Sequence, residues 1–152
     1  MTNEEKLVLV DQARDMAEEY FRSGGYFCSE AVVATINELL GSPFPKEIVR
    51  MASGFPIGIG KSGCVCGAIS GGVMALGMKY GRTEPGAPMP DSFPAAADLH
   101  DYIISEYGAT CCRVITSSFP EFGSPERKAH CVKITGQVAA WVMDRFLSSE
   151  AK

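Results

Sequence analysis

Apolar residues recur at steps of three and four positions in four separate parts of the chain. This spacing places them on one face of an α-helix, whereas the strict alternation typical of a half-buried strand is found nowhere. Ser124-Pro125-Glu126 is a strong helix start, with a capping serine and a proline at the first helical position. The pattern predicts amphipathic helices over Glu4–Phe21, Cys28–Leu40, Ala95–Tyr107 and Ser124–Leu147.

The segment from 53 to 81 departs from this pattern because it is rich in glycine and carries no charged residue from Ser62 to Met78. Each glycine costs a helix about 1 kcal/mol relative to alanine, so a helix here depends on tertiary packing. We therefore expect a buried central helix over Cys66–Tyr80, packed against the others through its glycines. The preceding loop, 54–63, has enough glycine for close backbone approach.

The chain is expected to form one domain over residues 1–152. Its 152 residues are 46% hydrophobic and show no break in composition, which is enough for a single core. A short helix over Pro45–Met51 and one or two turns over 111–116 complete the prediction. The result is an all-α bundle of about six helices, with a proline-rich surface excursion over Thr83–Pro94.

The uncharged run also raises the possibility of a membrane helix, since Gly67-x-x-x-Gly71 is a spacing at which membrane helices dimerise. The run has only 17 residues, the bare minimum for a span, and it lacks flanking aromatic belts. We expect no membrane span. An exposed part of this small-residue helix could instead form a self-complementary contact, and we expect a homodimer.

The balance of charge excludes further partners. A formal charge of -4 and a pI near 5.2 argue against binding to nucleic acid, which needs a basic face. The amino-terminal residues include acids where a secretory signal would be basic, so we expect a cytoplasmic protein. Gly58 to Gly63 also satisfies G-x-G-x-x-G, but the buried strand that a dinucleotide site needs before it is missing.

The six cysteines are the best candidates for chemistry. In a reducing compartment they favour metal binding or thiol reactions over a static disulfide framework. Cys28 and Cys131 fall on apolar helix faces, and Cys112 follows a predicted helix stop. Cys66 lies at the start of the central helix, where free N–H groups favour the thiolate. Each cysteine alone could be a packing residue, but the four together are expected to converge on one site.

The chain resembles the C-GCAxxG-C-C family, whose members are considered redox-active because of their cysteines. The resemblance rests on Cys28 in FCSEAV, the CGAISG motif at Cys66–Gly71, Cys112 after YGAT, and Cys131. It implies that these four cysteines are the functional ones and transfers no substrate. Cys64 and Cys111 lie outside the pattern, and we expect them to be dispensable.

Three mechanisms are compatible with this cysteine pattern. The four cysteines could bind an iron–sulfur cluster or another metal, for which thiolates are the usual soft ligands. A thiolate at Cys66 could instead exchange with the disulfide of an unidentified redox partner, through a neighbouring thiol such as Cys28, Cys64 or Cys112. The alternative is a non-catalytic interaction module with structural thiols. Gly63, Gly67 and Gly71, around Cys66, are the candidate cofactor-binding positions.

Overall fold

The computed structural model describes residues 1–150 and confirms the all-α class. These residues form six α-helices and one 3₁₀-helix: α1 (Asn3–Arg22), α2 (Cys28–Leu39), η1 (Lys46–Ala52), α3 (Gly67–Tyr80), α4 (Ser92–Tyr107), α5 (Cys112–Ile115) and α6 (Pro125–Glu150). Within this range, two extended segments of backbone pair with each other at a single place, which is an isolated antiparallel bridge between Val65 and Cys111. None of the helices described is both long and apolar enough to cross a membrane.

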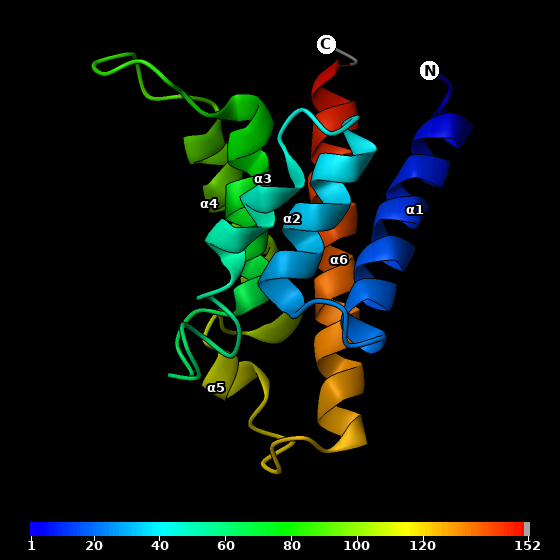
Figure 1. The fold of residues 1–152 in the computed structure, drawn as a ribbon, viewed down its shortest axis with the longest axis vertical. Helices are drawn as coiled ribbons and strands as arrows, with labels where there is room; N and C mark the ends of the chain where they lie inside the picture. Colours follow the sequence, from blue (N-terminus) through cyan, green and yellow to red (C-terminus); the bar gives the residue numbers. More distant parts are fainter. Residues whose placement is uncertain (151–152) are drawn as a thin grey trace.

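The long helices stand side by side along one axis. Figure 1 shows α1 next to α6, with α2 and α3 beside them and α4 on the outer side of α3. The start of α1 and the end of α6 lie at the top of this view, while α5 and the loops around it lie at the bottom. Because the chain runs upward in α2, α3 and α6, these helices begin at the same lower end as α5.

The central helix α3 is buried, as predicted, and its glycines are the reason that it can pack so closely. A Cβ atom added at Gly71 would lie 2.6 Å from the carbonyl oxygen of Ser29 on α2. One added at Gly72 would lie 2.6 Å from Val138 of α6 and 2.7 Å from Leu99 of α4. Real Cβ atoms do not approach other atoms this closely, so any larger residue would push the helices apart.

The fourth helix starts earlier than the sequence predicts. It begins at Ser92 rather than near Ala95, so it includes Pro94 in its first turn. Proline is tolerated there because the first backbone N–H groups of a helix have no partner within the helix. The proline-rich excursion therefore ends sooner than its composition indicates.

Candidate functional site

Three of the four predicted site cysteines stand at helix starts. Cys28 is the first residue of α2 and Cys112 the first of α5, while Cys66 caps α3 one residue before its first turn. Cys131 lies in the second turn of α6. Since these four helices begin at the same end of the bundle, the fold brings the cysteines to that end (Figure 1).

A short backbone ladder holds the starts of α3 and α5 together. The N–H of Cys66 donates to the carbonyl oxygen of Thr110 at 2.8 Å, and the N–H of Cys112 donates to that of Cys64 at 2.6 Å. A third bond runs from the N–H of Arg113 to the carbonyl oxygen of Gly63, at 3.1 Å. These bonds fix Cys66 and Cys112 next to each other although they are 46 positions apart in the chain.

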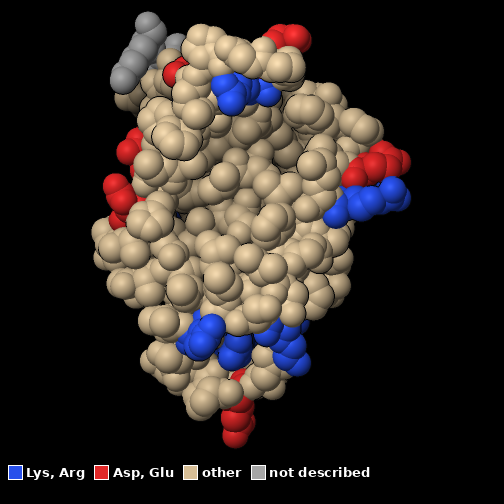
Figure 2. Space-filling model, turned by 90° about the vertical axis from the view of Figure 1, so that its left-hand side faces the viewer, with Lys and Arg blue, Asp and Glu red and all other residues tan. Residues whose placement is uncertain are grey.

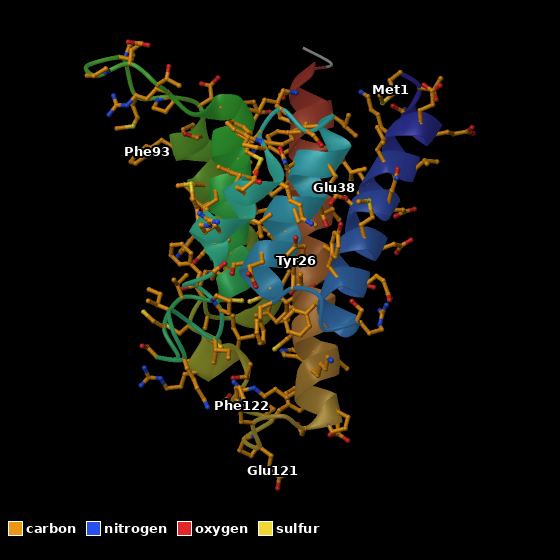
Figure 3. All side chains as sticks on the ribbon, in the orientation of Figure 1. Met1, Tyr26, Glu38, Phe93, Glu121 and Phe122 are labelled. Carbon is orange, nitrogen blue, oxygen red and sulfur yellow. The ribbon has the colours of Figure 1, made fainter. Side chains whose placement is uncertain are left out.

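All four cysteines line one cavity of about 490 Å³, a volume typical of small-molecule sites. Cys28, Cys66 and Cys112 are 8 to 9% exposed, whereas Cys131 is only partly buried. Figure 3 shows Tyr26, on the loop before α2, and Phe122, on the loop before α6; both residues line the cavity. Cys64 and Cys111 are exposed and lie outside the lining.

Burial controls the acidity of these thiols. It raises the pKa of Cys28 to about 12, with a further contribution from the neighbouring Cys66. The backbone N–H groups of Ser29 and Ile57 act on the sulfur in the opposite direction, and a weaker effect of Cys131 raises the pKa again. Cys28 is therefore a protonated thiol near neutral pH.

The expectation of a thiolate at Cys66 is wrong for this conformation. Burial raises its pKa to about 11, and it outweighs the N–H groups of Ala68 and Ile69, which favour the thiolate. These N–H groups at the start of α3 are the ones that the sequence predicts. They lower the pKa of Cys66 by less than removal of the sulfur from water raises it. Cys112 and Cys131 raise the pKa of Cys66 further.

Cys131 differs from Cys28 and Cys66 because a cation acts on it. Burial and the neighbouring Cys112 raise its pKa, while the guanidinium of Arg127 lowers it. Taken together, these effects link Cys66 electrostatically to each of Cys28, Cys112 and Cys131. Cys131 is linked in the same way to each of Cys28, Cys66 and Cys112.

The three candidate glycines have different positions. Gly67 lines the cavity, and a Cβ atom there would overlap the sulfur of Cys28. Gly71 packs against α2, and Gly63 packs against the side chain of Arg113, where a Cβ atom would lie 3.1 Å from the Arg113 Cβ. Gly67 therefore makes room for a site thiol, whereas Gly63 and Gly71 lie outside the lining.

The loop before α3 has an unusual backbone that the sequence does not predict. Five consecutive residues, 57 to 61, adopt positive φ angles between 57° and 68°. Left-handed backbone costs about 1–2 kcal/mol for each non-glycine residue, and three of the five, Ile57, Ile59 and Lys61, are not glycine. This strained turn places the N–H of Ile57 against the sulfur of Cys28.

Several residues of the site were missed by sequence reasoning. Arg127 lines the cavity and precedes Cys131 by four positions, so both lie on one face of α6. That spacing is a signal that the sequence contains. Phe122 also lines the cavity, between the cations Lys61 and Arg127, and no periodic pattern marks it because it lies in a loop.

The donor type fits a soft metal, but the arrangement does not. Within residues 1–150, no three His, Cys, Asp or Glu side chains are grouped as a metal ion requires. Four thiols that share one cavity therefore do not amount to a preformed metal centre in this conformation.

Comparison with known proteins agrees with the cysteine pattern. No curated protein and no solved structure matches the chain. One family model matches residues 26–145, a range that includes all four cavity cysteines, and its description is "Putative redox-active protein (C_GCAxxG_C_C)". Because this match covers most of the 152 residues, the chain belongs to the C_GCAxxG_C_C family.

Proposed function

We propose that the protein carries out thiol–disulfide chemistry at the cavity, with Cys66 as one of the reacting thiols. The observation that supports this most is that thiols from α2, α5, α6 and the cap of α3 line one cavity. Packing alone does not require four cysteines to share a location. Two adjacent thiols can form a disulfide and so give up two electrons.

The raised pKa values suit a protected dithiol. The thiolate is the reactive form, so thiols with pKa values of about 11 and 12 react slowly with oxidants from bulk water. Reaction then depends on a substrate that enters the cavity. A cytoplasmic location, which the sequence predicts, would keep these thiols reduced between reactions.

The two other mechanisms receive less support. A cluster or metal would require the thiols to regroup, because no suitable set exists among residues 1–150 as they stand. A purely structural role leaves the shared cavity unexplained. The redox partner and the homodimer remain predictions of the sequence.

Anaerobic purification followed by thiol titration tests the proposal. We expect a colourless protein without iron or sulfide, in which all six thiols titrate after denaturation. Mild oxidation should remove two of them, and dithiothreitol should restore them. Visible absorption together with iron and sulfide would instead favour the cluster mechanism, and an unchanged thiol count would leave the cysteines as packing residues.

A further inference from the structure

The rim of the cavity carries positive charge without a carboxylate partner. Arg127 and Lys128, from the first turn of α6, both line the cavity, and neither forms an ion pair with any residue from 1 to 150. Arg127 donates to the carbonyl oxygen of Phe119 at 3.4 Å, and its guanidinium lies 5.2 Å from the centre of the Phe122 ring. Most of its N–H donors therefore remain available.

The acid in the lining does not neutralise these cations. Glu30 accepts hydrogen bonds from the Phe27 N–H at 3.1 Å and from the Ser53 hydroxyl at 2.9 Å. Each of its two carboxylate oxygens thus accepts a hydrogen bond near the start of α2, and neither forms an ion pair with Arg127 or Lys128. On the face shown in Figure 2, basic side chains lie near the lower end of the molecule, below a broad uncharged area and above an acidic side chain. A ligand with negative charge suits this rim.

The rest of the lining is largely apolar. Ile57, Ile115 and Ile134 contribute aliphatic side chains, and Phe21, Phe27 and Phe122 contribute aromatic ones. Phe27 and Phe122 are 53% and 56% exposed, which is unusual for rings of this size unless they serve a contact. The ligand that suits these walls has an apolar or aromatic body.

Cys131 is the thiol nearest to this charged rim along the chain. It is the most exposed of the four cavity cysteines, and it shares a face of α6 with Arg127. An anion held by Arg127 would place the adjoining part of the ligand one helical turn from the Cys131 sulfur.

We propose that the cavity binds a small organic disulfide with an apolar body and an anionic group, and that Cys131 makes the first covalent bond to it. The proposal rests on the thiol–disulfide function and adds the substrate class and the order of events. Arg127 and Lys128 bind the anionic group and orient the sulfur–sulfur bond toward Cys131.

The reaction balances without a further reagent. The Cys131 sulfur attacks one sulfur of R–S–S–R′, the S–S bond breaks, and R′S⁻ leaves with the proton that Cys131 loses. Cys66 then attacks the Cys131 sulfur of the mixed disulfide, and RS⁻ leaves with the proton of Cys66. The products are RSH, R′SH and a Cys66–Cys131 disulfide, so two electrons pass from the protein to the ligand.

Two aromatic disulfides, one anionic and one neutral, test whether the ligand needs a negative charge. The reduced Cys64→Ser/Cys111→Ser protein, whose exposed thiols are removed, is mixed with anionic dithiobis(nitrobenzoate) or with neutral dithiodipyridine, and thiol release is followed by stopped flow. Relative to free cysteine, we expect the protein to favour the anionic reagent by roughly tenfold, and salt should weaken this preference. Equal relative rates at low salt would overturn the proposal.

Variants of the basic residues locate the effect. Arg127→Gln/Lys128→Gln should slow the anionic reagent roughly tenfold and leave the neutral one within about twofold. Arg113→Gln is the matched control, because Arg113 is an exposed cation near the loop but outside the cavity lining. If Arg113→Gln slows the anionic reagent as much as the double variant does, general surface charge explains the preference and the proposed site is wrong.

Mass spectrometry of a trapped intermediate tests the order of events. In Cys66→Ser, the mixed disulfide should accumulate on Cys131, because the second thiol is missing. Accumulation on Cys28 or Cys112 would overturn the assignment of Cys131 while leaving the thiol–disulfide function intact. No reaction of any cavity thiol in the parent protein would contradict the function itself.

Discussion

Two exposed cysteines and two buried ones lie close together in the chain but have different environments. Cys64 and Cys111 are exposed to solvent, while Cys66 and Cys112, one or two residues further on, are buried in the cavity wall. Both pairs belong to the same backbone ladder, in which the Cys112 N–H bonds the Cys64 carbonyl oxygen and Val65 pairs with Cys111. The ladder thus separates an outer pair of thiols from an inner pair.

This difference shows that the helix starts, and not proximity in sequence, define the site. Cys66 caps α3 and Cys112 opens α5, so each is placed where its helix begins. The exposed thiols lie one or two residues before those points. The inner thiols can be reached through the cavity, whereas any reagent in solution can reach the outer ones.

The largest expected difference is between removal of a buried cavity thiol and removal of the two exposed thiols. Cys66→Ser should abolish reversible disulfide formation in the cavity, because Cys66 is the thiol that closes the disulfide with Cys131 in the proposed reaction. Cys64→Ser/Cys111→Ser should retain it, with stability changed by less than about 0.5 kcal/mol, as for most surface substitutions. Thiol counts before and after oxidation measure both. If the double variant is the inactive one, the functional pair lies outside the cavity.

Alkaline pH should destabilise the protein through the inner thiols. The Cys28 pKa rises from 9.0 to about 12 on folding, so above pH 9 the unfolded chain binds fewer protons and the free energy of unfolding falls. One such group contributes about 1.4 kcal/mol per pH unit within this window. Urea unfolding at several pH values measures the slope.

Cys28→Ala provides the control for this slope. Tyr20 and Tyr107 also have pKa values raised to about 12, so they add to the same trend above pH 10. The variant should lose stability overall, but its dependence on pH should be shallower than that of the parent. An identical slope in the two proteins would mean that the Cys28 thiol is not buried in solution.

Gly67 and Gly77 offer a matched pair of glycines on α3. Gly67→Ala should destabilise the protein by about 1–3 kcal/mol, because the added methyl group overlaps the Cys28 sulfur. Gly77 is exposed, with no atom within 4 Å of an added Cβ, so Gly77→Ala should stabilise it by about 0.5–1 kcal/mol. Thermal unfolding reports both. Equal effects would contradict the close contact between α3 and Cys28.

The smallest effect concerns the left-handed turn next to the site. Ile59→Gly should stabilise the protein by about 0.5–1 kcal/mol, because relief of backbone strain exceeds the entropic cost of glycine. At Gly60, an added Cβ atom would meet no atom within 4 Å, but the left-handed backbone there is strained for alanine. Gly60→Ala should therefore destabilise the protein by about 1 kcal/mol. Chemical denaturation distinguishes the two signs. A loss of stability in Ile59→Gly would show that the turn is not strained.

The sequence predicts most of the helices, because their apolar spacing and their glycine and proline boundaries are local properties. It also predicts that α3 is buried, since a helix with four glycines and no acidic residue depends on its neighbours. The position of Cys66 follows from the same reasoning to within one residue. These predictions succeed because local preference and tertiary packing agree.

Other features depend on contacts that the sequence does not reveal. The left-handed backbone of Ile57 and Ile59 opposes the local preference of β-branched residues, so no propensity indicates it. The raised pKa of Cys66 reflects burial by the surrounding helices, which outweighs the favourable N–H groups that the sequence does show. Phe122 reaches the cavity from a loop without periodic pattern.

Disulfide mapping after mild oxidation tests the central claim most directly. The parent protein is treated with limiting oxidant, its remaining thiols are alkylated under denaturing conditions, and the linked peptides are identified by mass spectrometry. We predict that the first disulfide joins Cys66 to another cavity cysteine, while Cys64 and Cys111 are alkylated. A first disulfide that joins Cys64 to Cys111, or that links two molecules through either of them, would contradict it.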